Sequence, residues 1–183
     1  AMNDSETMVL HGETFELMIS AQEINDKTVA LAQQIKNDIG DEEIPLFICI
    51  LKGSFVFASD LLRAYKGLCE IEFVRVSSYA GTSSTGKVNT LLGMDYEKLR
   101  GRRVVIIEDI IDTGLTMQTI LKDLEAYAPK TLDVASLFIK PDKLCGTLSV
   151  KYNCFKIPDV FIVGYGLDYD ELYRNLPAIY IKK

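Results

Sequence analysis

The chain has 183 residues, of which 48% are hydrophobic and 25% charged, and its formal net charge is −6. These values are typical of a soluble globular protein that is long enough for a sizeable core. The acidic balance, without a long Lys/Arg run, argues against a nucleic-acid partner. The longest apolar runs fall far short of the ~20 residues of a membrane span. Four widely spaced cysteines with no C-x-x-C pair, and no signal-peptide pattern, predict a cytoplasmic protein with reduced thiols.

The first half of the chain alternates helical and strand patterns. Ser20 and Glu23 form a capping box before a periodic apolar face, and Gly40 follows the end of that face. A continuous apolar run after Pro45 indicates a buried strand. The elements expected in this half are a helix over 20–37, a strand over 45–51, a helix over 54–65 and a strand over 70–77.

The second half begins with a segment over 79–87 that is rich in Gly, Ser and Thr and predicts a mobile loop. The elements expected after it are strands over 103–107, 132–139 and 160–164 and a helix over 115–127. This order predicts an α/β fold with a mostly parallel central sheet flanked by helices, and ligands at the carboxyl ends of the strands. We expect one domain over 1–183, with a core over about 20–140 and a small hood from the N-terminal segment and about 141–183.

One stretch, residues 104–116, reads VVIIEDIIDTGLT and carries the chemistry. Glu108 and Asp109 fall where the buried strand is expected to finish, and Asp112 opens a strand-to-helix turn. Gly114 lets the backbone approach a ligand closely, and the N–H groups at a helix start cradle an anion. Because adjacent carboxylates repel a phosphate, they suit sugar hydroxyls, a hard cation such as Mg²⁺, or a proton released nearby. Hydroxyl donors follow at two positions, Thr113 and Thr116.

A plainer structural interpretation of this stretch also remains open. Strand-end acids followed by a Thr/Gly turn also occur as helix caps and solvated loops, although the full string makes that reading much weaker. Neither G-x-G-x-x-G nor G-x-x-x-x-G-K-[ST] occurs in the chain, which argues against dinucleotide and P-loop sites.

The stretch closely resembles the binding signature for phosphoribosyl pyrophosphate (PRPP) of type I phosphoribosyltransferases. The similarity runs from about 44 to 177 in the same order, through LKGSFVFASDLL, SSYAGTSSTG, the signature, ASLFIKPDK and IPDVFIVGYGLDYDELYRNLP. The better match is the six-oxopurine branch, the hypoxanthine-guanine phosphoribosyltransferases in their bacterial-type short form. The resemblance implies transfer of the 5-phosphoribosyl group from PRPP to N9 of hypoxanthine or guanine, which gives IMP or GMP plus pyrophosphate in purine salvage. It also implies Mg²⁺ as cofactor and a homodimer or homotetramer.

The resemblance assigns the sugar-phosphate contacts to the signature. The ribose 5-phosphate would be held by the turn residues Asp112, Thr113, Gly114, Leu115 and Thr116. Glu108 and Asp109 would hold the ribose 2- and 3-hydroxyls, whose oxygens also face Mg²⁺. Asp112 resembles the proposed general base, which takes the proton from purine N7.

Other segments carry the remaining contacts that the resemblance implies. Lys52 and Gly53 would bind pyrophosphate together with Arg174, with Ser54 as a further hydroxyl donor, and the 51–52 peptide is cis in some relatives. Lys140 would donate to the six-oxo group. Phe161 would stack on the purine and Ile162 would present backbone groups to its edge. Asp168 would contact both the purine and the metal, and Ser78 and Tyr79 would open the lid loop.

Each of these residues also has a plain structural interpretation. Lys52-Gly53 is by itself a turn between a strand and a helix, Lys140 a solvated lysine, Phe161 a strand-core residue, and Arg174 a surface residue. Two other functions stay open: a PRPP-sensing regulator that has lost transfer, and an enzyme of the same fold that uses orotate or adenine. The sequence does not decide whether xanthine is accepted, and it assigns no role to residues 143–153.

Overall fold

The structure is a computed structural model that describes residues 6–80 and 87–183. Its helices are α1 (Ala21–Ile39), α2 (Phe55–Ala64) and α3 (Leu115–Glu125), with short 3₁₀ turns η1 (Tyr96–Leu99) and η2 (Pro141–Lys143). The strands of the main sheet are β3 (Leu46–Ile50), β4 (Glu70–Ala80), β5 (Lys87–Leu92), β6 (Arg103–Ile111), β7 (Thr131–Ile139) and β8 (Tyr152–Lys156). Those of a smaller sheet are β1 (Thr7–Leu10), β2 (Glu13–Ile19), β9 (Ile162–Val163) and β10 (Ile179–Lys182).

The main sheet has the order β5-β4-β3-β6-β7-β8. All neighbouring pairs from β4 to β8 are parallel, and only β5 pairs antiparallel with β4. The register sets Cys49 of β3 opposite Ile107 of β6, and Ile107 opposite Ala135 of β7. The carboxyl ends of these three strands therefore meet at one edge of the sheet, as expected for a ligand site in an α/β fold.

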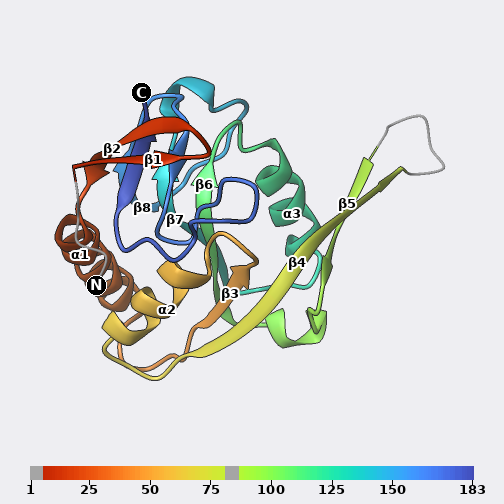
Figure 1. Cartoon of the computed structure of the whole chain (residues 1–183). Helices are drawn as coiled ribbons and strands as arrows, with labels where there is room; N and C mark the ends of the chain where they lie inside the picture. The colour runs from red at the N-terminus through yellow and green to blue at the C-terminus, as the bar shows by residue number, and fades with distance from the viewer. Residues whose placement is uncertain (1–5, 81–86) are drawn as a thin grey trace.

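Helices cover both faces of the main sheet because its central strands bury both sides. Phe47 and Cys49 of β3 face the core that contains the apolar sides of α1 and α2, whereas Leu46 and Ile48 face the core that contains α3. Figure 1 shows α1 and α2 on one side of the sheet and α3 on the other. This arrangement confirms the predicted mostly parallel α/β architecture.

The small sheet has the order β1-β2-β10-β9 and is antiparallel throughout. This sheet joins the N-terminal segment to the C-terminal end of the chain. It packs around a third hydrophobic core of the molecule, which contains Phe15, Val163 and Tyr180. In Figure 1 it lies over the carboxyl ends of the main strands. Residues 152–156, which fall in the segment predicted to belong to the hood, form β8 and pair with β7 in the main sheet.

Most predicted elements agree with the structure to within a few residues. The capping box is present: Ser20 Oγ accepts from Glu23 N at 3.1 Å, and Glu23 Oε1 accepts from Ser20 N at 3.2 Å. Two strands are longer than predicted, since β4 continues to Ala80 and β6 to Ile111. Strands β5 and β8 were not predicted, and the predicted strand 160–164 is reduced to β9.

The lid region differs from the prediction at both ends. Ser78 and Tyr79, predicted to open a loop, lie in β4 and pair with Asn89 and Val88 of β5. Figure 1 shows the β4–β5 ribbon projecting away from the body of the molecule. The rest of the predicted loop, residues 81–86, lies outside the described residues. Across the described chain, no helix has the length and apolarity needed to cross a membrane.

Candidate active site

The turn between β6 and α3 borders a cavity of about 240 Å³. Gly114 is the N-cap of α3 with φ of +78°, a left-handed conformation that glycine adopts without strain. Leu115 N lies 3.3 Å from Thr113 Oγ1, so the hydroxyl caps the start of the helix. The cavity is lined by Glu108, Ile110, Ile111, Asp112, Thr113, Gly114, Thr116, Met117 and Ile120. The turn therefore presents the start of a helix to an open space, which is the geometry of an anion site.

Glu108 and Asp109 lie inside β6 rather than beyond its end, which corrects the predicted strand boundary. Their carboxylates cap the local backbone: Glu108 Oε1 accepts from Asp109 N at 3.0 Å and Asp109 Oδ1 accepts from Ile110 N at 2.8 Å. Burial, and then the neighbouring Asp109, raises the pKa of Glu108 well above its ordinary value. The raised pKa favours the neutral, protonated form of Glu108, which suits a side chain that faces a sugar hydroxyl.

Gly53 brings the loop after β3 against Asp109. A Cβ at Gly53 would stand 2.0 Å from Asp109 Oδ2, so no larger residue fits there without moving the carboxylate. The Leu51-Lys52 peptide before it is cis. Ser54, a predicted hydroxyl donor to pyrophosphate, is instead fully buried and donates to the backbone carbonyl of Ile50. Its role is corrected to an internal one.

Lys52 faces the segment 168–174, which carries two of the predicted residues. Lys52 Nζ lies 3.0 Å from Glu171 Oε2, and Arg174 Nη2 lies 3.5 Å from the same oxygen and 3.6 Å from Asp168 Oδ2. Glu171 N donates to Asp168 Oδ2 at 2.9 Å. The predicted cations are therefore brought together by Glu171, a carboxylate that the sequence analysis did not single out. The ion pairs with Lys52 and Arg174 show that both side chains point at a common anionic position.

Lys140 lies immediately after β7, beside the turn of the signature. Its Nζ is 3.1 Å from Asp112 Oδ1 and 3.1 Å from Asp159 Oδ1, and its side chain is only 11% exposed. Burial alone lowers the pKa of Lys140, but the two carboxylates outweigh it and the pKa is raised. The lysine is therefore cationic and not a solvated surface residue. Asp159 was missed because its partners are distant in the sequence.

Phe161 is exposed to 47%, which excludes the strand-core interpretation. Its ring lies 5.3 Å from that of Tyr169 in an edge-to-face arrangement, beside a pocket of about 370 Å³. Ile162 follows in β9, an edge strand whose free side leaves backbone groups for a ligand. This pocket is lined by Phe161, Asp168, Tyr169, Asp170 and Lys182.

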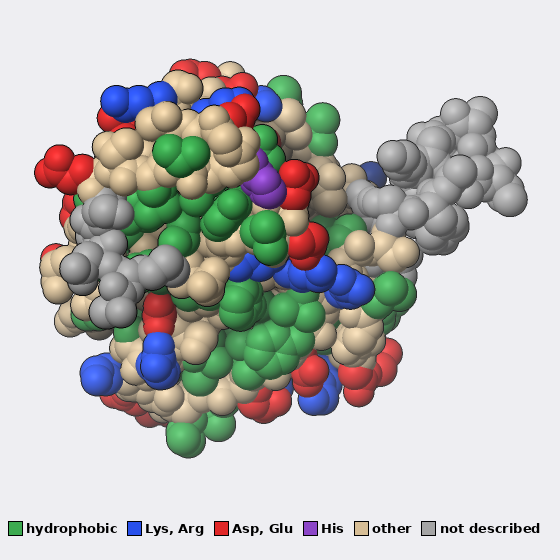
Figure 2. All heavy atoms as spheres, viewed as in Figure 1, with side chains coloured by type: hydrophobic (Ala, Val, Ile, Leu, Met, Phe, Trp, Pro, Cys, Tyr) green, Lys and Arg blue, Asp and Glu red, His purple; other side chains and the backbone are tan. Residues whose placement is uncertain are grey.

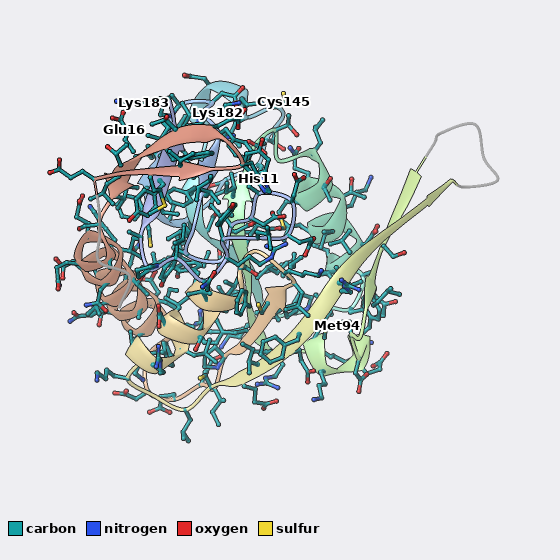
Figure 3. The ribbon with its side chains drawn as sticks, in the orientation of Figure 1. His11, Glu16, Met94, Cys145, Lys182 and Lys183 are labelled. Atoms are coloured by element: carbon teal, nitrogen blue, oxygen red, sulfur yellow. The ribbon has the colours of Figure 1, made fainter. Side chains whose placement is uncertain are left out.

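The β1–β2 hairpin reaches this pocket from above. His11, at its tip in Figure 3, has its ring centroid 4.4 Å from that of Tyr169. Glu13 accepts a hydrogen bond from Tyr169 Oη at 2.9 Å and pairs with Lys182 Nζ at 3.0 Å. His11 thus helps to hold the segment that carries Asp168, through its contact with Tyr169.

The donor chemistry fits a magnesium ion that is shared with a substrate. Within the part of the chain that the structure describes, no group of three or more His, Cys, Asp and Glu side chains could hold a metal alone. Mg²⁺ usually keeps waters and binds one or two carboxylates together with substrate phosphates. Asp109 and Asp168 offer such carboxylates: Asp109 Oδ1 accepts from Ile110 N at 2.8 Å, and Asp168 Oδ2 accepts from Glu171 N at 2.9 Å.

Residues 143–153, which had no predicted role, contact the signature turn. Cys145 N donates to Thr113 O at 2.9 Å, and Gln118 Nε2 donates to Cys145 O at 2.7 Å. Leu148 packs so closely on Gly114 that a Cβ there would stand 2.6 Å from its Cδ2. This segment therefore supports the turn from outside the cavity.

Comparisons with known proteins identify the family of the chain. Residues 19–170 match the family model described as "Phosphoribosyl transferase domain". The hypoxanthine-guanine phosphoribosyltransferase of Streptococcus thermophilus is 39% identical over 177 residues, which cover 96% of this chain and 97% of that protein. A crystal structure of a hypoxanthine-guanine phosphoribosyltransferase from Bacillus anthracis has a TM-score of 0.81 at 39% identity and covers 92% of this chain and 99% of that one.

A more distant relative has the same architecture. The Trypanosoma cruzi hypoxanthine phosphoribosyl transferase aligns with a TM-score of 0.81 at 32% identity, over 92% of this chain and 91% of that one. The extent of the family match and the identity to full-length relatives leave no ambiguity about ancestry. The chain belongs to the phosphoribosyltransferase family and has its type I fold.

Proposed function

We propose that this enzyme is a hypoxanthine-guanine phosphoribosyltransferase of purine salvage. It transfers the 5-phosphoribosyl group from PRPP to N9 of hypoxanthine or guanine and releases pyrophosphate. The observation that carries the proposal is the placement of Asp112 and Lys140 side by side, 3.1 Å apart, at the mouth of the signature turn. A proton acceptor and a cationic donor at that spacing match two adjacent groups of an oxopurine, N7–H and the six-oxo oxygen.

The phosphate groups of PRPP are held at two places. The 5-phosphate sits at the start of α3, where the 112–116 backbone and the Thr113 and Thr116 hydroxyls donate to it. Pyrophosphate takes the position that Glu171 occupies between Lys52 and Arg174, because its oxygens suit both cations. The sugar thereby lies over β6, with its hydroxyls toward Glu108 and Asp109.

The bond changes follow from this placement. Purine N9 attacks C1 of the ribose as the bond from C1 to the pyrophosphate oxygen breaks, and the electron pair leaves with pyrophosphate. The N7 proton passes to the carboxylate of Asp112, which restores a neutral purine ring. Lys52 and Arg174 stabilise the charge that builds up on the leaving group. Asp109 and Asp168 would hold Mg²⁺ together with substrate oxygens, and the ion would supply further charge neutralisation for pyrophosphate.

Lys140 sets the choice of base. An ammonium group only donates, so it accepts an oxo group and opposes the six-amino group of adenine. A mismatch with a buried polar group discriminates between substrates by about 10⁴-fold or more. Phe161 supplies the stacking surface, and the free edge of β9 at Ile162 meets the base edge.

One assay tests the proposal. Purified protein is incubated with PRPP, Mg²⁺ and each of hypoxanthine, guanine, xanthine, adenine and orotate. We expect nucleotide formation with hypoxanthine and guanine, and none with adenine or orotate. The result with xanthine defines the polarity of the pocket at the purine two-position. Transfer to adenine or orotate would refute the base assignment, and transfer to none would favour a PRPP-sensing regulator.

An Asp112→Asn variant tests the role of the proposed base. General-base catalysis is typically worth ~10²–10⁴ in rate, so kcat should fall by that order while PRPP binding weakens less. Nearly unchanged turnover would count against the assignment. Chelation of Mg²⁺ in the same assay should abolish transfer and be reversed by added Mg²⁺.

The protein is further proposed to be a cytoplasmic homodimer or homotetramer. Large apolar side chains are exposed where β3 meets α2 and on β4, at Leu51 (38%), Phe55 (43%) and Phe73 (52%). Figure 2 shows hydrophobic side chains gathered on this face of the molecule. Such a patch suits an interface between copies. Light scattering after gel filtration should give a multimer, and a Phe73→Glu variant should shift it toward the monomer.

A further inference from the structure

The ammonium group of Lys140 is held between two carboxylates that come from different parts of the fold. Asp112 belongs to the turn between β6 and α3, whereas Asp159 lies between β8 and β9. Both Oδ1 atoms are 3.1 Å from Nζ. An ammonium has three donors, so this arrangement occupies two and leaves one for a further acceptor.

Asp159 is itself oriented by a second lysine. Its Oδ2 lies 3.6 Å from Lys143 Nζ, while its Oδ1 faces Lys140. The side chain of Lys140 is only 11% exposed, and its backbone N donates to Ile111 O at 3.0 Å. Each oxygen of the Asp159 carboxylate therefore faces a lysine, and the closer contact is the one to Lys140.

The two carboxylates differ in what the proposed reaction demands of them. Asp112 takes the N7 proton, and a protonated carboxyl no longer acts as a counter-charge. At that moment Asp159 is the remaining anion within ion-pair distance of Lys140 among the described residues. Without Asp159, no carboxylate of the described residues would remain charged within ion-pair distance of Lys140 while its donor must stay on the six-oxo oxygen.

We propose that Asp159 is a positioning residue for the purine: it holds Lys140 on the six-oxo group and thereby supports selection of oxopurines. This inference rests on the proposed function. Asp159 acts through Lys140 and needs no contact with substrate. Its loss should weaken purine binding selectively, because the PRPP contacts at Lys52, Arg174 and the signature turn do not involve it.

The test compares Asp159→Ala and Asp159→Asn with a matched control, Asp142→Ala. Asp142 is an exposed acid in η2, two residues after Lys140, and no ion pair is seen for it in the described chain. We expect Asp159→Ala to raise KM for hypoxanthine about tenfold and to leave KM for PRPP within about twofold. A tenfold change is of the order of the interaction energy between two residues in contact, here Asp159 and Lys140. Asp159→Asn, which keeps an acceptor oxygen, should give a smaller rise. The ratio of kcat/KM for hypoxanthine over adenine should fall in Asp159→Ala.

A second background separates positioning from a structural effect. In a Lys140→Met variant, the further Asp159→Ala change should alter KM for hypoxanthine by less than about twofold, because the anchored group is gone. Thermal melting of each variant checks that it is folded. If Asp159→Ala does not fold, Asp159→Asn takes its place in the comparison.

Three results overturn the inference. These are an Asp159→Ala enzyme indistinguishable from the Asp142→Ala control, an equal rise in KM for PRPP, and a full tenfold effect that persists in the Lys140→Met background. A wild-type protein that transfers ribose phosphate to no base overturns the proposed function and this inference with it. An active wild type with an indifferent Asp159→Ala variant overturns this inference alone.

Discussion

The contact between Gly53 and Asp109 yields the sharpest prediction. An alanine Cβ at position 53 would stand 2.0 Å from Asp109 Oδ2 and 2.9 Å from its Cγ, whereas real Cβ atoms essentially never come closer than 3.0 Å to another heavy atom. Asp109 must therefore withdraw by at least 3.0 − 2.0 = 1.0 Å. Gly53 is not among the residues with positive φ, so the effect of the substitution is steric and does not arise from backbone strain.

A displacement of this size acts on the ribose and on the metal contact at once. Misplacement of a catalytic group by about 1 Å can cost ~10²-fold in rate, so kcat/KM for PRPP should fall about 100-fold in Gly53→Ala. Steady-state kinetics with varied PRPP at saturating hypoxanthine measures this. The fold should persist, because Asp109 is only half-buried and its side chain has space to move.

Gly67→Ala is the matched control. Gly67 likewise lacks a positive φ, but its nearest neighbours are Cε and Nζ of Lys36 at 3.1 Å, the far end of a flexible side chain. We expect wild-type kinetics for this variant. If Gly53→Ala stays within about threefold of the wild type, the assignment of Asp109 to the PRPP site is wrong.

Three further predictions concern the frame of the site. Gly114→Ala forces a left-handed alanine against Leu148 Cδ2, at 2.6 Å from the new Cβ, and should cost about 1–2 kcal/mol or more of unfolding free energy in urea titrations; unchanged stability would show that Leu148 moves freely. Tyr165→Phe removes the 2.5 Å hydrogen bond to Asp60 and should lower stability by about 1–2 kcal/mol, with KM for PRPP as the control. Ser54→Ala should cost about 1 kcal/mol and leave KM for PRPP unchanged, since the hydroxyl faces the core; a large rise in KM would restore Ser54 as a pyrophosphate ligand.

Local patterns predicted much of the fold. The capping box at Ser20 and Glu23 is satisfied by backbone groups three residues away, so it can be recognised without tertiary information. The buried strands were recognised by continuous apolar runs. Strand ends were less well predicted, as at Ile111, because β6 continues through polar residues that pairing with β7 holds in place.

The predicted lid shows the opposite failure. Its Gly, Ser and Thr content indicated a loop from residue 79, yet β4 continues to Ala80 through antiparallel pairing with β5. Pairing partners distant in the sequence thus outweighed local composition. The same reason explains why residues 152–156 were placed in the hood: a single segment carries no signal for the sheet that it joins.

What the sequence determined by itself is the short-range chemistry: the acids, hydroxyls and glycine of the signature occupy consecutive positions, so their order fixes which groups surround an anion at the start of α3. Only the tertiary structure decided which distant groups complete the site. Asp159 and Glu171 became visible as partners of Lys140 and Lys52 once parallel pairing had brought the ends of three strands together. Ion pairs between distant segments, such as Lys52–Glu171 and Lys140–Asp159, act over a few ångströms in space and leave no trace in sequence spacing.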